Sequence, residues 1–158
     1  MIKVLIADDH AIIRRGLKQI VAETNDIVVG SEAANGSEVM EKVRAQPLDV
    51  VILDITMPGR NGLDTLKELK REQPRLPVLM LSMHSEDQYA ARVLKAGAAG
   101  YLPKECAPEE LLNAIRTVHT GAKYIPPRRR TGSPGRHFSI WTSRRMNYCP
   151  TASTKCCG

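Results

Sequence analysis

The sequence predicts an α/β fold, a doubly wound five-stranded parallel sheet with five helices. Short apolar runs alternate five times with segments of helical periodicity in the first 124 residues, which is the pattern of repeated βαβ units. The run at residues 49–53 is apolar after its first residue, as is typical of a strand buried on both faces of a parallel sheet. Five such units fill about 120 residues, an ordinary domain size.

The first unit combines an apolar strand at residues 2–7 with a helix predicted over residues 11–24. The strand runs directly into two acids, Asp8 and Asp9. We expect the helix to turn an apolar face to the sheet and a basic face to solvent. The apolar residues are Ile12, Ile13, Leu17, Ile20 and Val21, and the basic residues are Arg14, Arg15 and Lys18.

The second unit begins with a strand at residues 27–30. Its helix opens at the turn Asn35-Gly36-Ser37, which supplies an N-cap, and stops before Pro47, because proline cannot continue a helix. The apolar residues at helical spacing are Val39, Met40 and Val43.

The third unit contains the central strand at residues 49–53, which leads into Asp54. A Pro-Gly turn follows, and the third helix opens at Asn61-Gly62 and ends near Pro74. Its apolar residues are Leu63, Leu66 and Leu69.

The last two units follow the same scheme. A strand at residues 78–81 reaches Ser82, and Ser85 is expected to cap a helix with Glu86 and Asp87 in its first turn, where acids suit the helix dipole. That helix stops at Gly97 and is followed by a short strand at residues 100–102. The final helix opens at Pro108, closes at Gly121 and turns inward Leu111, Leu112, Ile115 and Val118.

Polar residues follow four of the predicted strands. They are Asp8 and Asp9 after the first, Asp54 after the third, Ser82 after the fourth and Lys104 after the fifth. Because parallel strands end at the same edge of a sheet, these side chains are expected to converge on one crevice there.

The composition of this crevice favours phosphoryl transfer. Three carboxylates close together repel one another, and a hard divalent cation such as Mg²⁺ offsets that repulsion. Lys104 adds a positive charge that can meet a phosphoryl oxygen. The sequence has no glycine-rich nucleotide-binding loop, so the phosphate must arrive on a partner. Asp54 is the candidate nucleophile, since a carboxylate can form an aspartyl-phosphate.

These residues resemble a known family. Asp8-Asp9, the Asp54 turn, Ser82, the Gly97–Tyr101 segment and Lys104 are similar to the receiver domain of two-component response regulators. The amino-acid sequence of residues 81–105 is most similar to that of the NarL/LuxR-type subfamily, whose members carry a C-terminal DNA-binding helix-turn-helix. The resemblance covers residues 1 to about 124 and implies the flavodoxin-like strand order 2-1-3-4-5.

The resemblance implies a role for each residue. Asp54 would accept phosphate from a histidine kinase. Asp9, Asp54 and the backbone carbonyl of Thr56 would bind Mg²⁺ directly, and Asp8 would act through water. Ser82 and Tyr101 would form the switch, with Tyr101 moving inward as Ser82 turns to the phosphoryl group. The protein would take part in its own phosphorylation and dephosphorylation without being an enzyme, and could form a homodimer.

Taken singly, several of these residues have simpler explanations. Asp8 or Asp9 could cap the first helix, and His10 could have a role at the helix start as well as influence the acidic pair. His84 is expected to be a surface or packing residue. Pro103 precedes Lys104, whereas many receivers have proline after the lysine, and we expect the Leu102–Pro103 bond to be trans.

Composition argues against a membrane protein. Hydrophobic residues make up 42% of the chain, enough for a packed core, but no apolar run approaches the roughly 20 residues of a membrane span. Two acidic residues, Asp8 and Asp9, lie too close to the N-terminus for this segment to be a signal peptide. We therefore expect a soluble cytoplasmic protein.

The net charge of +6 is divided unevenly. Residues 1–125 carry 16 basic and 17 acidic side chains, whereas residues 126–158 carry seven basic ones and no acid. This tail has no helical period, and its three cysteines lack zinc-site spacing. We predict a disordered tail in which arginines could bind nucleic acid only weakly.

The tail also lacks the opening phrase of a LuxR-type DNA-binding domain. A shift of the reading frame would explain this. When the codons possible for residues 146–158 are translated from the last base of the Met146 codon, they permit E-L-L-S-D-R-E-Y-E-V-L, which is an opening sequence of that kind. We therefore divide the chain into a receiver at residues 1–124 and a tail at residues 125–158 that is a frameshifted remnant. DNA binding is expected of the intact parent and not of this chain.

Two other functions remain open from the sequence. One is a magnesium-dependent phosphatase or phosphotransferase with Asp54 as nucleophile, although the short loops leave no obvious substrate pocket. The other is a nucleic-acid binder acting through the basic tail.

Overall fold

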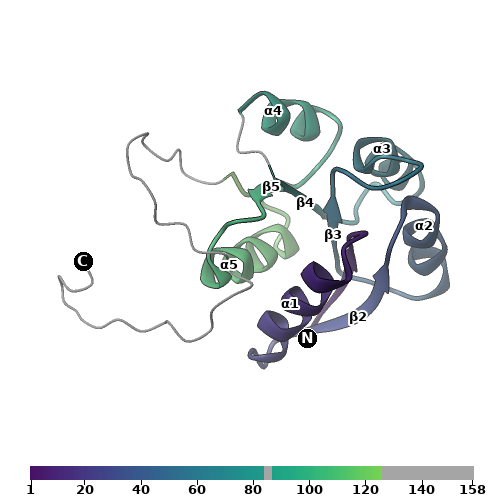
Figure 1. Ribbon diagram of the computed structural model, residues 1–158. Coiled ribbons are helices and arrows are strands. Elements are labelled where there is room, and N and C mark those ends of the chain that lie inside the picture. The colour runs from purple at the N-terminus through teal and green to yellow at the C-terminus, as the bar shows by residue number, and fades with distance from the viewer. Residues whose placement is uncertain (84–86, 126–158) are drawn as a thin grey trace.

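The computed structural model describes residues 1–83 and 87–125, and strands alternate with helices throughout (Figure 1). The strands are β1 (Ile2–Ala7), β2 (Ile27–Ala33), β3 (Val50–Asp54), β4 (Val78–Ser82) and β5 (Gly100–Pro103). The helices are α1 (Ala11–Ala22), α2 (Gly36–Ala45), α3 (Gly62–Glu72), α4 (Asp87–Lys95) and α5 (Pro108–His119).

The five strands form one parallel sheet in the order β2-β1-β3-β4-β5. Helices α1 and α5 cover one face, and α2, α3 and α4 cover the other (Figure 1). The predicted fold class and strand order are therefore confirmed. In this order β1 and β3 are neighbours at the centre, so their carboxyl ends lie side by side.

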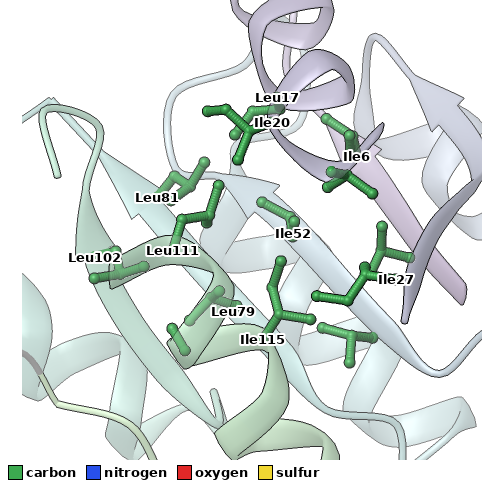
Figure 2. Packing of buried hydrophobic residues seen from close by; sticks show 14 of the residues in the cluster. Ile6, Leu17, Ile20, Ile27, Ile52, Leu79, Leu81, Leu102, Leu111 and Ile115 are labelled. Carbon is green, nitrogen blue, oxygen red and sulfur yellow. The ribbon is translucent and has the colours of Figure 1, made fainter. Parts of the chain in front are cut away.

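Two hydrophobic cores explain why the central strands are apolar at successive positions. Ile6 and Ile52 face the core under α1 and α5, whereas Leu5, Val51 and Leu53 face the core under α2, α3 and α4. Successive side chains of a strand point to opposite faces, so a strand covered on both sides has no solvent-facing position. Figure 2 shows Ile52 within the first core, among residues of α1 and α5.

The helix starts of α2 and α3 agree with the predicted caps. The side-chain oxygen of Asn35 accepts a hydrogen bond from the backbone N–H of Glu38 at 2.9 Å. The side-chain oxygen of Asn61 accepts one from the N–H of Asp64, also at 2.9 Å. Each bond satisfies an N–H that the helix itself leaves without a partner. Ser85, the predicted cap of α4, lies outside the described residues.

The prediction was wrong for Ile12, which is 76% exposed. A helix advances by about 100° per residue, so Ile12 lies far around α1 from the face formed by Ile13, Leu17, Ile20 and Val21. Leu17, Ile20 and Val21 are buried, and Ile13 packs against the same core.

Strand β2 is longer than predicted and reaches Ala33. Its register against β1 shifts between Val4 and Leu5, so that Val29 and Ser31 pair with them while Gly30 is skipped. Gly30 and the polar residues after it break the apolar pattern, which is why the sequence suggested an earlier end.

The chain returns to the sheet after α5. Tyr124 forms a parallel bridge with Gly100, and its N–H donates to the carbonyl of Ala99 at 2.8 Å. Residues 126–158, to which the disordered tail, its cysteines and the frameshift hypothesis belong, lie outside the described residues. Within the described part of the chain, no helix is long and apolar enough to cross a bilayer.

Candidate functional site

The structure gathers buried polar side chains at the carboxyl edge of the sheet. The buried polar or charged residues of the described chain are Asp8, Asp54, Thr65, Ser82 and Lys104. Four of the five follow or end β1, β3, β4 and β5, and they are at most 3% exposed. Burying charge is costly unless it is paired, so this concentration marks a site.

Lys104 is paired with two carboxylates at once. Its Nζ lies 2.7 Å from Asp8 Oδ2 and 3.1 Å from Asp54 Oδ2. The backbone N–H of Lys104 donates to the carbonyl of Ser82 at 2.7 Å, which fixes where the side chain enters the site. The structure thus brings Asp8, Asp54 and Lys104 together, as the strand ends predicted.

The pairing leaves the carboxylates under-satisfied. Beyond the shared Nζ of Lys104, the buried oxygens Asp8 Oδ2 and Asp54 Oδ2 have no partner among the described residues. Burial, and after it the negative charge of Asp8, raise the pKa of Asp54 to about 6, although Lys104 partly offsets both effects. Two carboxylates share a single nearby cation, so a further cation would lower the free energy of this site.

The loop after β3 holds Asp54 from the other side. The Thr56 N–H donates to Asp54 Oδ1 at 3.2 Å, and the Gly62 N–H donates to the carbonyl of Ile55 at 2.7 Å. Thr56 is exposed, so its peptide group lies at the rim of the site. Gly59 has a φ of +80° in the turn between them, a conformation that glycine adopts without strain.

Asp9 and His10 form the outer part of the site. The Asp9 side chain is 29% exposed and that of His10 is 60% exposed. His10 Nδ1 lies 3.1 Å from Asp8 Oδ1 and 3.1 Å from Asp9 Oδ1. His10, and neither acid, occupies the N-cap position of α1, and its side chain makes no capping hydrogen bond. Capping therefore does not explain the acidic pair.

Four residues of this cluster carry the donor atoms of a divalent-cation site. Ligand atoms of Asp8, Asp9, His10 and Asp54 all lie within 4.8 Å of one another. Carboxylate oxygens are suitable ligands for Mg²⁺, and the two under-satisfied Oδ2 atoms belong to members of this set. The residues present therefore fit a magnesium ion.

Ser82 and Tyr101 lie next to this cluster along β4 and β5. Both are 3% exposed. Tyr101 belongs to the core under α2, α3 and α4, and its backbone N–H donates to the carbonyl of Tyr124 at 3.3 Å. The main chain of Tyr101 is thus joined to the segment after α5.

Two features of the site were not predicted from the sequence, namely a side-chain contact and a pocket. The Arg14 guanidinium donates to the Asp8 carbonyl at 2.7 Å and to Glu32 at 3.2 Å, although Arg14 was expected to face solvent. A pocket of about 270 Å³ opens beside the loop after β3, where Thr56, Tyr89 and Arg92 are among its lining residues. The position of Arg14 one helical turn after His10 was an available signal, whereas nothing in the sequence signals the pocket.

Comparisons with known proteins agree with this geometry. The family model described as "Response regulator receiver domain" matches residues 4–116. The response regulator UvrY of Escherichia coli O6:H1 is 41% identical over 125 residues, which are 79% of this chain and 57% of UvrY. The chain thus spans a little over half the length of that relative.

Two solved structures are similar to the described fold. A two-component response regulator of the LuxR family from Aurantimonas sp. SI85-9A1 has a TM-score of 0.74 at 29% identity, covering 77% of this chain and 86% of that one. The isolated REC domain of RcsB from Salmonella enterica serovar Typhimurium, in the presence of phosphomimetic BeF3-, has a TM-score of 0.73 at 27% identity. That match covers 79% of this chain and 93% of the RcsB chain.

Proposed function

Because the chain belongs to the response regulator receiver domain family, we propose that it is a phosphoacceptor switch in which Asp54 receives a phosphoryl group from a histidine kinase. The observation that carries this proposal is the buried triad of Asp8, Asp54 and Lys104 at the carboxyl edge of the sheet. Lys104 places a positive charge beside the nucleophilic carboxylate, where it can balance a phosphoryl oxygen once a further cation offsets the two carboxylates.

In the proposed reaction, an Asp54 carboxylate oxygen attacks the phosphorus of a phosphohistidine. The new O–P bond forms as the P–N bond breaks, and the imidazole leaves with a proton from solvent. Lys104 then balances charge on a phosphoryl oxygen, which requires it to loosen its contact with Asp54 Oδ2. Mg²⁺, held by Asp9, Asp54 and the Thr56 carbonyl, with Asp8 acting through water, would supply further neutralisation of the transferred group.

The proposed switch works through Ser82 and Tyr101. The Ser82 hydroxyl would turn to a phosphoryl oxygen, and Tyr101 would settle inward against it. Ser82 follows Leu81, the partner of Asp54 in the sheet, and Tyr101 pairs with Met80 two residues before Ser82, so a local hydrogen bond can bias the packing of β4, β5 and α4. The protein acts as a stoichiometric acceptor that helps its own phosphorylation and dephosphorylation, with no small-molecule substrate turned over.

The partners follow from this role. A histidine kinase supplies the phosphoryl group to this protein in the cytoplasm, and a second copy of the chain is a possible dimer partner. We further propose that the parent protein is a transcriptional regulator with a C-terminal DNA-binding domain.

Phosphorylation by acetyl phosphate and Mg²⁺, followed on a phosphate-affinity gel, tests the proposal. The unsubstituted chain should show a retarded band, and Asp54→Asn should abolish it. Asp64→Asn, a substitution at an exposed position of α3, should retain the band. A band of equal intensity in Asp54→Asn would place the acceptor elsewhere. Sustained release of phosphate from a small phosphoester, beyond one equivalent, would favour a phosphatase.

A further inference from the structure

Asp8 is fully buried, and each of its polar groups has a contact within the protein. Its N–H donates to the Ala33 carbonyl at 3.1 Å, its Oδ1 accepts from the His10 N–H at 2.8 Å, and its Oδ2 lies 2.7 Å from Lys104 Nζ. The remaining group is the Asp8 carbonyl, to which Arg14 Nη1 donates at 2.7 Å. A buried carbonyl without a donor is unfavourable, so Arg14 completes the set of contacts that hold the Asp8 main chain.

Glu32 of β2 holds the Arg14 guanidinium from its other side. Arg14 Nε donates to Glu32 Oε1 at 3.2 Å, and Lys18 Nζ donates to Glu32 Oε2 at 2.7 Å. The hydrogen bond from Lys18, and after it the one from Arg14, lower the pKa of the Glu32 carboxyl, although burial raises it. The guanidinium is planar with its donors in a fixed arrangement. Its two contacts therefore fix its orientation between Glu32 and the Asp8 carbonyl.

The Arg14 contacts join three elements at the carboxyl edge of the sheet. Arg14 lies in α1, Glu32 lies in β2 beside Ile6 of β1, and Asp8 directly follows β1. The carbonyl that Arg14 holds belongs to the peptide group between Asp8 and Asp9. A rotation of this peptide group would turn both acidic side chains, so the guanidinium is placed to set the direction of the pair.

We propose that Arg14, anchored by Glu32, is a positioning residue that orients the Asp8–Asp9 peptide so that both carboxylates face the Mg²⁺ site. The expected effect on phosphorylation rests on the proposed function, whereas the contacts of Arg14 exist in the metal-free protein. A positive charge alone would repel a cation, so its removal would strengthen Mg²⁺ binding. Positioning predicts the opposite sign, because the loss of Arg14 leaves the two carboxylates misdirected.

Hydrogen exchange of the metal-free full chain tests the contact itself. In Arg14→Gln, exchange of the Asp8 N–H should become about tenfold faster relative to that of the Val51 N–H, as loss of one net hydrogen bond implies. The Val51 N–H donates to the Pro77 carbonyl near the opposite end of the sheet and reports global stability. Arg15→Gln removes the same charge at an exposed position of α1. This control should leave Asp8 exchange unchanged.

The rate of phosphorylation by acetyl phosphate, measured over a range of Mg²⁺ concentrations, tests the effect on the site. Arg14→Gln should raise the half-saturating Mg²⁺ concentration about tenfold. The rate at saturating Mg²⁺ should change much less, because a bound ion itself orders the carboxylates. Arg14→Lys keeps the charge, but a single ammonium cannot reproduce the two-donor fork, so it should recover only part of the loss. Arg15→Gln should behave like the unsubstituted chain.

A double-mutant cycle with Glu32→Gln tests the anchoring of Arg14. Glu32→Gln should raise the half-saturating Mg²⁺ concentration in the same direction as Arg14→Gln. The double variant should resemble Arg14→Gln alone, because residues that act through one contact are not additive. Lys18→Gln leaves the contact between Arg14 and Asp8 intact and should have a smaller effect than Glu32→Gln. Independent, additive effects of Arg14→Gln and Glu32→Gln would show that Glu32 does not anchor the guanidinium.

Three other results would overturn the inference. A lower half-saturating Mg²⁺ concentration in Arg14→Gln would show that Arg14 acts through its charge. Full recovery in Arg14→Lys would show that the two-donor contact is not needed. Equal acceleration of the Asp8 and Val51 amides would show that Arg14 only stabilises the fold. A chain that is not phosphorylated at all would refute the proposed function, and Asp8 exchange in Arg14→Gln would still decide whether Arg14 holds the peptide.

Discussion

The α-carbon of Gly62 packs against the carbonyl group of Asp54. A Cβ at Gly62 would lie 2.7 Å from the Ile55 α-carbon and closer still to the Asp54 carbonyl oxygen, a separation at which backbone must move. The first turn of α3 is therefore pressed against the main chain of Asp54, the proposed phosphoacceptor. Glycine is needed here for close approach, since its φ is not in the left-handed region.

Gly62→Ala tests this contact. Alanine normally stabilises a helix by up to about 1 kcal/mol relative to glycine, but here we expect a loss of about 2 kcal/mol or more because the overlap is with backbone. Displacement of the loop should also slow phosphorylation of Asp54. Asp64→Ala, exposed in the same turn, is the control. Urea denaturation and the phosphate-affinity gel measure both effects, and a stabilised, normally phosphorylated Gly62→Ala would contradict the close approach.

Asp54 should make stability depend on pH. Its folded-state pKa of about 6 is above the usual 3.8, so between these values the folded protein holds a proton that the unfolded chain has released. This stabilisation is complete below about pH 4 and is lost as pH rises through 6. Asn at this position cannot ionise. The free energy of unfolding of Asp54→Asn should therefore exceed that of the unsubstituted, metal-free protein by about 2–3 kcal/mol at pH 8, and the two values should be equal near pH 4.

Unfolding by urea at several pH values, without metal, measures this difference. Asp26→Asn provides a control with the opposite sign, because its hydrogen bond with Arg116 lowers the pKa of Asp26. Addition of Mg²⁺ should reduce the difference in free energy of unfolding between Asp54→Asn and the unsubstituted protein. A gap that is independent of pH would show that burial and Asp8 do not perturb Asp54.

Lys104 should be essential to the stability of the metal-free protein. Lys104→Met leaves Asp8 and Asp54 buried without their shared cation, and breaking a buried pair in this way costs about 3–5 kcal/mol. The loss should be larger at pH 8 than at pH 5, where protonation of Asp54 relieves the repulsion. Lys67→Met, at an exposed position of α3, should change stability by less than about 0.5 kcal/mol. Similar small losses for both variants would refute the role of the ion pairs.

The contact between Gly100 and Tyr124 should hold the segment after α5 on the sheet. A Cβ at Gly100 would lie 2.9 Å from the Tyr124 carbonyl oxygen and 2.9 Å from Leu79 Cδ1. Gly100→Ala should therefore release the Tyr124 N–H from the Ala99 carbonyl and speed its hydrogen exchange about tenfold, as loss of one net hydrogen bond implies. Tyr124→Phe keeps these backbone bonds and should exchange like the parent. Unchanged exchange in Gly100→Ala would show that the sheet can absorb the extra methyl group.

Local sequence patterns were sufficient for most of the fold. The continuous apolar run of β3 indicated burial on both faces, and Asn35 and Asn61 marked helix starts that the structure confirms. The pattern was a poorer guide where a long-range partner decides the outcome. β2 continues past Gly30 because β1 lies beside it and supplies backbone partners. Ile12 is exposed because helical rotation, and not its hydrophobicity, sets the direction of its side chain.

The sequence by itself determined which chemistry this protein can carry, because a parallel sheet delivers whatever follows its strands to one edge. Only the tertiary structure decided that Lys104 lies between Asp8 and Asp54, that Arg14 reaches the Asp8 carbonyl, and that the His10 ring lies beside Asp8 Oδ1 and Asp9 Oδ1. These contacts join side chains whose separation depends on how the strands and helices pack. Periodicity fixes the face of an element, whereas a distance of about 3 Å between residues 8, 54 and 104 requires the whole sheet to be assembled.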